Sequence, residues 1–407
     1  MHVLEHSLLE PEIQETPYAY YRACHQQAPV HFSAPLNAWI VTRYRDVQTV
    51  LSHPEIWAND LLVKAGFSMF QHPEARQILE SKGWPRDTRL QSDPPSHRDY
   101  RALVATAFTA GRVRNLGPFI ESIASELASE MARTPECDFI ERFAAWLPIR
   151  VITHLLGIPV EDAAKIKHWS DAWVEPLSGV VSLEREIEVA RLGLELQHYL
   201  ADWMERKQSE PGEDVLTTLA NACFPDGRQL PTGEKMGIAE HLIVGGHETV
   251  TSALASGLWL LIEHPGVLAA LRRDRASMRN FVEEALRLES PSQGFFRYAE
   301  KDGEVAGVVI PRGAMVHVRF AAANRDPEQF PDPDVLDLER KNSGSHMAFS
   351  QGEHHCVGAP LARLELTSAF GVLLDRFEHF EIVPGTAIRH LPGIALRTLA
   401  ALPIRYA

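Results

Sequence analysis

Residues 232–264 carry the longest helical pattern in the sequence, with apolar residues recurring at three- and four-residue spacing. At 1.5 Å per residue, such a helix is on the order of 48 Å long, which is enough to cross a whole domain. Two adjacent glycines, Gly245 and Gly246, lie near its middle, and each costs about 1 kcal/mol relative to alanine. Close helix packing explains them, and so does a distorted turn that leaves room for a ligand.

Other helical segments are frequent, whereas strand-like patches are few. Helices are expected near 115–133, 138–156, 183–207, 277–289 and 359–377. Strands are expected at 30–32, 39–42, 305–310, 316–318 and 403–406. Residues 55–92 and 324–355 show little regular period and are interpreted as two long ordered loops. The predicted fold class is therefore mainly α with small peripheral β-sheets.

No linker divides the 407 residues, because there is no Gly/Ser tract, Pro-rich spacer or long run of like charge. The sequence therefore predicts a single domain over residues 1–407. The net charge of −14 argues against nucleic acid and anionic membranes as general partners. The N-terminus lacks the features of a signal peptide, and the apolar run 252–262 is too short to span a bilayer. We expect a cytoplasmic monomer without a membrane anchor.

Residues 349–358, with the sequence FSQGEHHCVG, place a cysteine directly before a helix-like run. The other cysteines, Cys24, Cys137 and Cys223, form no CxxC pair and are interpreted as small buried hydrophobes. Cys356 lies at a helix N-terminus, where unpaired N–H groups and the helix dipole favour negative charge. Such a position lowers the pKa of a thiol and favours the thiolate.

Three interpretations of Cys356 compete. A buried structural cysteine is the common outcome for an arbitrary cysteine. A zinc site with His346, His354 and His355 lacks the paired spacing that zinc ligands usually show. Haem iron is the third interpretation, because a cysteine thiolate is one of its known axial ligands.

The loop resembles the haem-binding loop of the cytochrome P450 family. The matching positions are Phe349, Gly352, His354, Cys356 and Gly358. The two glycines permit a close approach of the backbone to a flat cofactor. The family usually has glycine where this chain has Ser350, which we expect to fit with a negative φ. The resemblance implies the cytochrome P450 fold, a haem b cofactor and Cys356 as the axial ligand of its iron, and it leaves His355 without a role.

A second signature concerns Glu284 and Arg287, three residues apart on an expected helix. Alone they would form an ordinary helical ion pair. In the family this pair supports the irregular stretch before the cysteine loop, and we expect Arg325 to be its third member.

A third signature concerns the haem propionates. His97 and Arg101, four residues apart on one helix face, resemble the family's propionate-binding pair. Arg297 and His354 match two further propionate positions. The resemblance thus assigns four donors to two carboxylates.

Glu248 and Thr249 directly follow the paired glycines of the central helix. They resemble the family's oxygen-activation site, in which an acid and an alcohol help to deliver protons, and Gly245 belongs to the cofactor-binding positions. The family often has Thr or Ser where this chain has Val250, which removes one hydrogen-bonding group.

The resemblance implies a haem-thiolate monooxygenase. It would activate dioxygen to hydroxylate, or oxidatively dealkylate, a small to medium and largely apolar organic substrate. A peroxide-using or rearranging enzyme and a haem sensor or carrier are alternatives that would not need Glu248 and Thr249. The chain has no GxGxxG site and no cysteine cluster, so a ferredoxin with its reductase is the expected electron source. The basic run of Arg98, Arg101, Arg112 and Arg114 fits an acidic ferredoxin or a solvated helix face equally well.

Candidate substrate contacts come from three segments. His241 shares a helical stripe with Gly245 and Thr249, so it is either a buried, satisfied histidine or a residue that hydrogen-bonds a polar group of the substrate. An apolar pocket and ordinary core packing both explain the remaining candidates. These are Gln293, Phe295, Phe296, Phe67 and Phe70.

Overall fold

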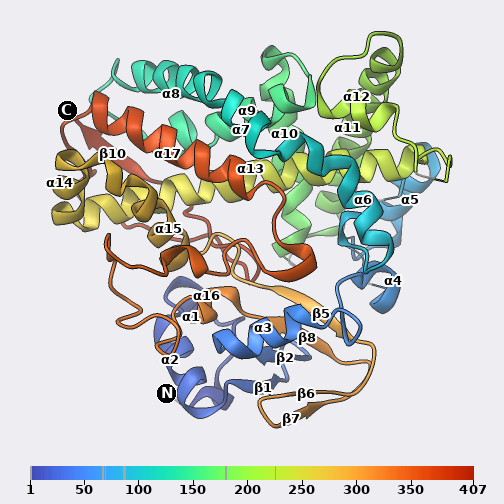
Figure 1. Cartoon of the computed structure of the whole chain (residues 1–407), viewed down its shortest axis with the longest axis horizontal. Coiled ribbons are helices and arrows are strands. Elements are labelled where there is room, and N and C mark those ends of the chain that lie inside the picture. Colours follow the sequence, from blue (N-terminus) through green and yellow to red (C-terminus); the bar gives the residue numbers. More distant parts are fainter. Residues whose placement is uncertain (1, 67, 69, 86–88, 179–180, 225) are drawn as a thin grey trace. The chain divides into compact units, whose positions relative to one another are not determined.

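The computed structural model describes residues 2–66, 68, 70–85, 89–178, 181–224 and 226–407 (Figure 1). The described chain is mainly helical with small sheets, which confirms the predicted fold class. It forms two compact units: unit 1 comprises residues 1–66, 117–144 and 249–407, and unit 2 comprises 67–116 and 145–248. The single domain over the whole chain stays a prediction.

Unit 1 contains every strand that the structure describes, together with a set of helices. Its helices are α1 (Pro11–Glu15), α2 (Tyr18–Gln27), α3 (Tyr44–Ser52), α4 (Leu61–Ala65), α8 (Gly117–Met131), α14 (Pro265–Arg273), α15 (Met278–Glu289), α16 (Phe320–Ala323) and α17 (Ala359–Arg376). Its strands are β1 (Val30–Ser33), β2 (Ala38–Val41), β3 (Trp57–Ala58), β4 (Glu136–Asp138), β5 (Phe295–Ala299), β6 (Gly303–Val305), β7 (Val308–Ile310), β8 (Met315–Val318), β9 (Phe380–Ile382) and β10 (Pro403–Tyr406).

Unit 2 is helical. It contains α5 (Pro73–Lys82), α6 (Ser96–Ala105), α7 (Ala110–Asn115), α9 (Trp146–Leu156), α10 (Ala163–Val174), α11 (Leu183–Ser209) and α12 (Val215–Ala220). Helix α13 (Thr232–Glu263) belongs to unit 2 as far as Glu248 and to unit 1 from Thr249 onward. It matches the predicted central helix to within one residue.

The main sheet of unit 1 has the strand order β1-β2-β8-β5-β3. Strands β2 and β8 are parallel, and the other neighbours are antiparallel. One face of the sheet packs on a core around Val47, Phe320 and Phe330, all of which are fully buried. Smaller sheets join β4, β10 and β9, and β6 with β7. The main sheet matters for the site because β5 carries Arg297 in register with Val316 of β8.

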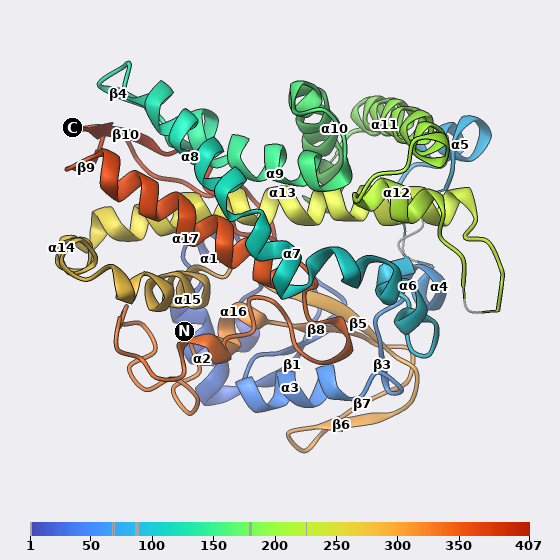
Figure 2. The ribbon, with the colours of Figure 1, turned by 45° about the horizontal axis from the view of Figure 1, so that its top comes forward.

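Helix α17 packs along α8 and against α15, and both views show α8 and α17 side by side (Figure 2). The rings of Phe281 and Phe370 meet edge to face between α15 and α17, with centroids 5.2 Å apart. A Cβ at Gly257 would lie 2.5 Å from the Phe370 ring, so α13 can pass this close only with glycine there. These contacts hold α17, the helix that follows the cysteine loop.

The Glu284–Arg287 pair is fully buried on α15, as its supporting role requires, with Nε–Oε1 at 2.6 Å. Arg287 also donates to carbonyls of the irregular stretch, at Asn324, Pro333 and Val335. The prediction that Arg325 is the third member of this group is wrong. Arg340 takes that place, with its Nε 3.1 Å from Glu284 Oε2.

The reason is that Arg325 already has other partners. Its Nη2 donates to the Leu288 carbonyl at 2.8 Å, and its Nη1 donates to Asp334 at 2.6 Å. Arg325 therefore pairs with Asp334, and Arg340 pairs with Glu284. Buried charges are usually accommodated by such pairing.

In unit 2, α11 packs against α5, α10 and α12. A core cluster joins α5 to α10 and α11, with Leu79, Trp173 and Val189 among its buried members. Gly193 of α11 is tightly packed, because a Cβ there would lie 2.6 Å from the Trp173 ring. These contacts hold α10, which carries residues of the candidate site.

Several sequence predictions need correction. Residues 55–92 do not form one long loop: they contain β3, α4, α5 and a 3-10 turn at Arg89–Gln91. Residues 305–310 form a hairpin instead of one strand, because Ala306 and Gly307 both have positive φ, at 52° and 79°. Within 138–156, a π-helical turn at Ile140–Ala144 precedes α9.

The cysteines also divide differently from the prediction. Cys24 is buried, Cys137 is half-buried and Cys223 is exposed, so the interpretation as a small buried hydrophobe holds for Cys24 and is wrong for Cys223. Among the described residues, no single helix is long and apolar enough to cross a membrane. Within the described part of the chain, one pair of helices, α13 and α14, reaches that length and composition together, but the pair is bent by 101°.

Candidate active site

The loop that carries Cys356 lies in unit 1, between a 3-10 turn at Gly352–His354 and the start of α17. Two backbone hydrogen bonds close it. The Cys356 N–H donates to the Phe349 carbonyl at 2.9 Å, and the His355 N–H donates to the Gly352 carbonyl at 3.1 Å. The Cys356 side chain is exposed, which excludes a buried structural cysteine.

Two residues of this loop have left-handed backbone conformations: φ is 58° at Ser350 and 73° at Gly352. A Cβ at Gly352 would also lie 2.8 Å from the Leu51 carbonyl oxygen, so glycine is required there for two reasons. The negative φ expected at Ser350 was wrong. Its buried hydroxyl has no hydrogen-bond partner among the described residues.

Helix α17 begins directly behind the cysteine. Gly358 is its N-cap residue, and the Gly358 carbonyl accepts from the Ala362 N–H at 2.9 Å. Pro360 lies in the first turn, as expected, because no donor is needed there. The N-terminal end of an 18-residue helix therefore lies beside the thiol and favours its negative form.

The histidine nearest to the loop in sequence has a structural role. His346 is buried, and its Nε2 lies 3.1 Å from Glu283 Oε2. Arg363 of α17 pairs with the same carboxylate at 2.6 Å and lies over the Phe349 ring, 4.6 Å from its centroid. Burial would raise the pKa of Glu283, but the hydrogen bonds from His346 and Arg363 outweigh it and hold that pKa at about 2. His346 is thus committed to Glu283, which argues against the zinc interpretation.

Arg297 and His354 both lie in unit 1. The side-chain amide of Asn59 lies 3.4 Å from His354 Nδ1. Asn59 directly follows β3, whose last residue Ala58 pairs with Tyr298, the residue after Arg297 on β5. The Arg297 side chain is buried, and its Nη1 donates to the Phe296 carbonyl at 2.8 Å. Both predicted propionate donors therefore lie in unit 1, and Asn59 contacts His354, a neighbour that the motifs did not indicate.

His97 and Arg101 lie in unit 2, on one face of α6. His97 is buried, whereas Arg101 is partly exposed. The intervening Tyr100 donates from its hydroxyl to Glu234 of α13 at 3.0 Å, which ties α6 to the central helix. The helix thus holds both side chains at fixed positions within unit 2.

The two central glycines of α13 have different surroundings. A Cβ at Gly246 would lie 3.2 Å from Ile152 of α9, so this glycine serves close packing. At Gly245 nothing lies within 4 Å of the Cβ position, so this glycine leaves open space. Helix α13 is α-helical throughout, so the distorted turn is wrong. The room for a ligand comes from the missing side chain alone.

Glu248 lies in a polar cluster of unit 2 that sequence analysis did not find. Its Oε1 is 3.6 Å from His247 Nδ1, and that nitrogen is 4.0 Å from Asp171 Oδ1 of α10. Lys167, one turn earlier on α10, pairs with Asp171 at 2.5 Å. Burial and the nearby Asp171 charge raise the pKa of Glu248 to about 7, and Lys167 partly opposes this. The carboxyl therefore changes protonation near neutral pH.

Known proteins are similar to this chain over nearly its whole length. The family model for Cytochrome P450 matches residues 203–399. The cytochrome P450 monooxygenase PikC of Streptomyces venezuelae is 35% identical over 412 residues, covering 99% of this chain and 94% of that protein. This chain belongs to the cytochrome P450 family. The vitamin D(3) 25-hydroxylase of Pseudonocardia autotrophica is 33% identical over 407 residues, covering 98% and 96% of the two chains.

A solved structure agrees with this assignment. CYP109E1 from Bacillus megaterium in complex with testosterone has a TM-score of 0.84 and 30% identity, covering 97% of this chain and 99% of that one. As a cytochrome P450, the protein is a haem-thiolate monooxygenase. It binds an organic substrate and dioxygen and takes electrons from a redox partner.

The residues of this P450 fit a haem. An exposed thiol is presented by a loop of fixed shape in unit 1, and the buried guanidinium of Arg297 supplies a donor of the kind that propionates need. The bare helix surface at Gly245 accommodates a bulky group in unit 2. The donor set is one thiol with cationic and imidazole groups, which suits an iron porphyrin better than a bare metal ion.

Three of the predicted substrate contacts of the P450 are either buried or outside the described residues. Gln293 is buried and committed to protein partners: its Nε2 donates to the carbonyls of Glu289 and Ser290, and its Oε1 accepts from Tyr21 at 2.8 Å. Phe70 is buried in the core cluster of unit 2. Both side chains serve packing, and their contact with a substrate stays a prediction. Phe67 lies outside the described residues.

The other substrate candidates keep their interpretation. His241 is only partly buried, and burial lowers its pKa, so its imidazole is neutral at pH 7. Phe295 has 43% of its surface exposed. Phe296 is half-buried, and its ring meets the His317 ring edge to face at 4.8 Å. These side chains remain accessible to a ligand.

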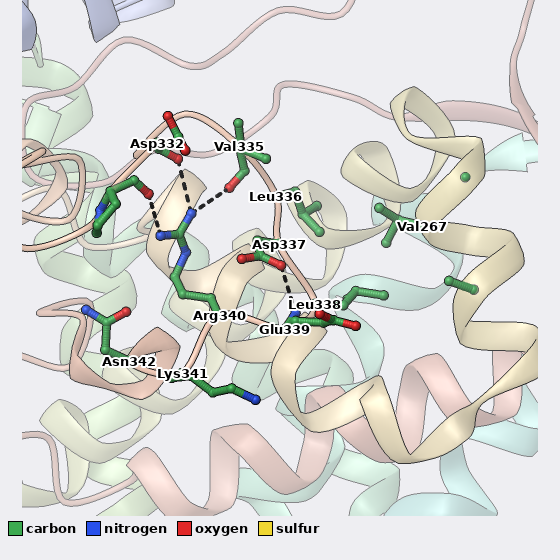
Figure 3. A pocket seen from close by; sticks show the side chains of 13 residues that line it. Val267, Asp332, Val335, Leu336, Asp337, Leu338, Glu339, Arg340, Lys341 and Asn342 are labelled. Carbon is green, nitrogen blue, oxygen red and sulfur yellow. Dashed lines mark hydrogen bonds between the residues drawn. The ribbon is translucent and has the colours of Figure 1, made fainter.

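A surface pocket of about 610 Å³ lies elsewhere in unit 1 (Figure 3). It is lined by α14 and by residues 331–342. Its wall includes Arg340, whose Nη2 donates to the carbonyls of Asp332 and Val335. None of the predicted site residues lines it, so it belongs to the loop framework that Arg340 holds together.

Proposed function

We propose that Cys356 is the axial thiolate ligand of the haem iron. We further assign Arg297 and His354 of unit 1, and His97 and Arg101 of unit 2, to the haem propionates. The exposed thiol in a loop closed by backbone hydrogen bonds is the observation that carries this proposal. The helix start behind Cys356 stabilises its negative charge.

When bound, the haem supplies the activation of dioxygen for insertion of one oxygen atom into a C–H bond. The chain's own residues manage protons and position. Burial, and to a smaller extent the Asp171 charge, raise the pKa of Glu248 to about 7. Glu248 can therefore both hold and release a proton near neutral pH. Thr249, the next residue of α13, would donate its own hydroxyl proton and take a replacement proton from Glu248. Gly245 leaves the helix surface open for the reactants.

We propose a largely apolar organic substrate that meets Phe295 and Phe296 and donates to or accepts from the neutral imidazole of His241. Apolar walls with few polar anchors are typical of such pockets. Relatives named for vitamin D3 and crystallised with testosterone support a rigid, mainly hydrocarbon skeleton with one or two oxygens. Hydroxylation, or dealkylation through hydroxylation of the adjacent carbon, is the proposed reaction.

A ferredoxin with its reductase is the proposed electron source. Arg98, Arg112 and Arg114 on α6 and α7 have exposed side chains, in a chain whose net charge is −14. A local basic surface of this kind attracts an acidic partner and makes the association rate fall with salt. Replacing the three arginines by glutamine should slow reduction by ferredoxin and remove much of the salt dependence.

The spectrum of the reduced, CO-bound protein tests the haem assignment. The native protein should show the red-shifted Soret band of a thiolate ligand. Cys356→Ser should lose it, whereas Cys223→Ser, which changes another exposed cysteine, should keep it. An unchanged band in Cys356→Ser would overturn the assignment.

Substrate and electron source need separate measurements. Titration of the ferric protein with steroids and secosteroids should give a spin-state shift, which His241→Phe should weaken. Turnover driven by ferredoxin and reductase should exceed turnover driven by peroxide. Faster peroxide-driven turnover would instead favour a peroxide-using enzyme.

A further inference from the structure

The pocket between α14 and residues 331–342 of unit 1 has the size of a small-molecule site (Figure 3). Its volume of about 610 Å³ lies within the usual range of about 300–1,000 Å³ for ligand pockets. This volume equals that of roughly twenty water molecules at about 30 Å³ each, so a ligand of about 10–20 non-hydrogen atoms fits. None of the predicted site residues lines the pocket, which is therefore separate from the candidate active site.

Apolar side chains form the walls of this pocket on two sides. Helix α14 contributes Val267 and Ala270, which are half-buried. The segment that faces it contributes Val335, Leu336 and Leu338. Val335 has 54% of its surface exposed, so hydrocarbon is left open to water here. An apolar ligand would cover this hydrocarbon, which favours binding. The walls therefore suit a ligand with an aliphatic body.

The buried wall residue Arg340 is committed to protein partners. Its Nε donates to Glu284 Oε2 at 3.1 Å, and its Nη1 donates to the Pro331 carbonyl at 2.7 Å. Its Nη2 donates to the carbonyls of Asp332 and Val335 (Figure 3). These hydrogen bonds hold the segment in one shape, as an ordered ligand site requires. The charge of a ligand is therefore selected by the other polar groups of the pocket.

Carboxylates outnumber exposed cations at this pocket. Asp332, Asp337 and Glu339 line it, against the exposed ammonium of Lys341, whereas Arg340 is buried. The Asp337 carboxylate accepts a hydrogen bond from the Glu339 N–H at 2.8 Å. Among the described residues, the carboxylates of Asp332 and Glu339 pair with no cation, and both residues are exposed. The net charge of −14 on the whole chain adds to the attraction for a cation.

We propose that this pocket is a second ligand site, which binds an organic ammonium ion with an aliphatic body. The ammonium group pairs with the carboxylates of Asp332 and Glu339, and the hydrocarbon covers the apolar walls at Val267 and Leu338. The proposal does not depend on the haem assignment. Hexyltrimethylammonium is a suitable probe, because its roughly ten non-hydrogen atoms fit the volume. Its quaternary nitrogen has no lone pair, so it cannot ligate the haem iron.

Calorimetric titration of the full-length, ferric, haem-loaded protein with hexyltrimethylammonium tests the chemical class. One site with a Kd of about 1 mM is expected for so small a ligand. Asp332→Asn combined with Glu339→Gln should weaken binding about tenfold, because each exposed ion pair contributes about threefold. Glu304→Gln removes an exposed carboxylate from β6 of the same unit and should leave the Kd unchanged. Heptanoate, which has a similar hydrocarbon and the opposite charge, should bind at least about tenfold more weakly than the ammonium ion.

Gly266→Leu tests the location of the site. Gly266 lines the pocket, and nothing lies within 4 Å of its Cβ position, so leucine there occupies the pocket without a clash. Binding should be lost in Gly266→Leu and mostly kept in Gly266→Ala, while both variants keep the native CO spectrum and a urea midpoint no lower than native. Unchanged binding in Gly266→Leu, or a haem spin-state shift with the calorimetric midpoint, would place the ligand elsewhere and overturn the proposal. Equal binding of heptanoate, or no saturable binding at about 10 mM, would overturn it as well.

Discussion

Replacing Ser350 by glycine should stabilise the protein. Ser350 lies in the cysteine loop, two residues before Gly352. Ser350 adopts φ of 58°, a conformation that costs an L-residue about 1–2 kcal/mol. Its buried hydroxyl lacks a hydrogen-bond partner among the described residues, which costs about 1–2 kcal/mol more. The greater freedom of glycine in the unfolded chain offsets about 0.5–1 kcal/mol. The expected net gain is therefore about 2 kcal/mol in the free energy of unfolding.

Two controls separate these contributions. Ser350→Ala removes the hydroxyl but keeps the strained Cβ, so it should gain about 1 kcal/mol. Ala306→Gly, at an exposed turn residue of unit 1 with φ of 52°, relieves a similar backbone conformation without a buried hydroxyl. Urea unfolding of the ferric protein, followed by tryptophan fluorescence and Soret absorbance, gives all three values. The reasoning is refuted if Ser350→Gly is no more stable than the native protein.

Three further changes test other parts of the structure by the same unfolding measurement. Glu248→Gln should stabilise the protein by about 3 kcal/mol at pH 8, at 1.36 kcal/mol per pH unit of pKa difference. Because the pKa of about 7 in the folded protein exceeds the ordinary 4.5, the ionised carboxylate destabilises the folded protein increasingly as the pH rises from 4.5 to 7. The stability gained by Glu248→Gln should therefore vanish below pH 4.5. A gain in stability that does not depend on pH would contradict this. His317→Leu should stabilise by about 1–3 kcal/mol, because both buried ring nitrogens lack partners among the described residues, and a loss would show that they are satisfied. Arg340→Met should cost about 3–5 kcal/mol by leaving buried Glu284 underpaired, whereas the exposed neighbour Lys341→Met should change little.

The long periodic helices could be predicted from the sequence, because their apolar faces are long enough to reveal the period. Helices α11, α13, α15 and α17 lie within two residues of their predicted bounds. Helix α5 was missed because only Ala75 and Leu79 of its ten residues are buried, which leaves too short an apolar stripe. Strand β5 was missed because its pairing with β8 and β3 is set by residues distant in sequence.

The candidate site also has residues that a local motif predicts and residues that only the tertiary structure brings together. Cys356 and the pair Glu284–Arg287 could be recognised from the sequence, because each belongs to a short motif of residues that lie close together along the chain. The choice of Arg340 over Arg325 depends on the path of an irregular stretch, which no local pattern encodes. Asp171 lies 77 residues before Glu248, so only the packing of α10 on unit 2 could show that they meet. At Ser350 the motif indicated where a glycine was expected, but the sign of φ had to come from the structure.

The parallel pairing of β2 with β8 has a consequence for synthesis on the ribosome. Strand β2 ends at Val41, and β8 begins 274 residues later, at Met315. At about 5–20 residues per second, β1 and β2 wait roughly 15 to 55 s for their neighbour to be translated. All of unit 2 emerges in that interval and can complete its own core first. The nascent chain meanwhile carries an unpaired strand edge, the kind of surface that chaperones must shield from other chains.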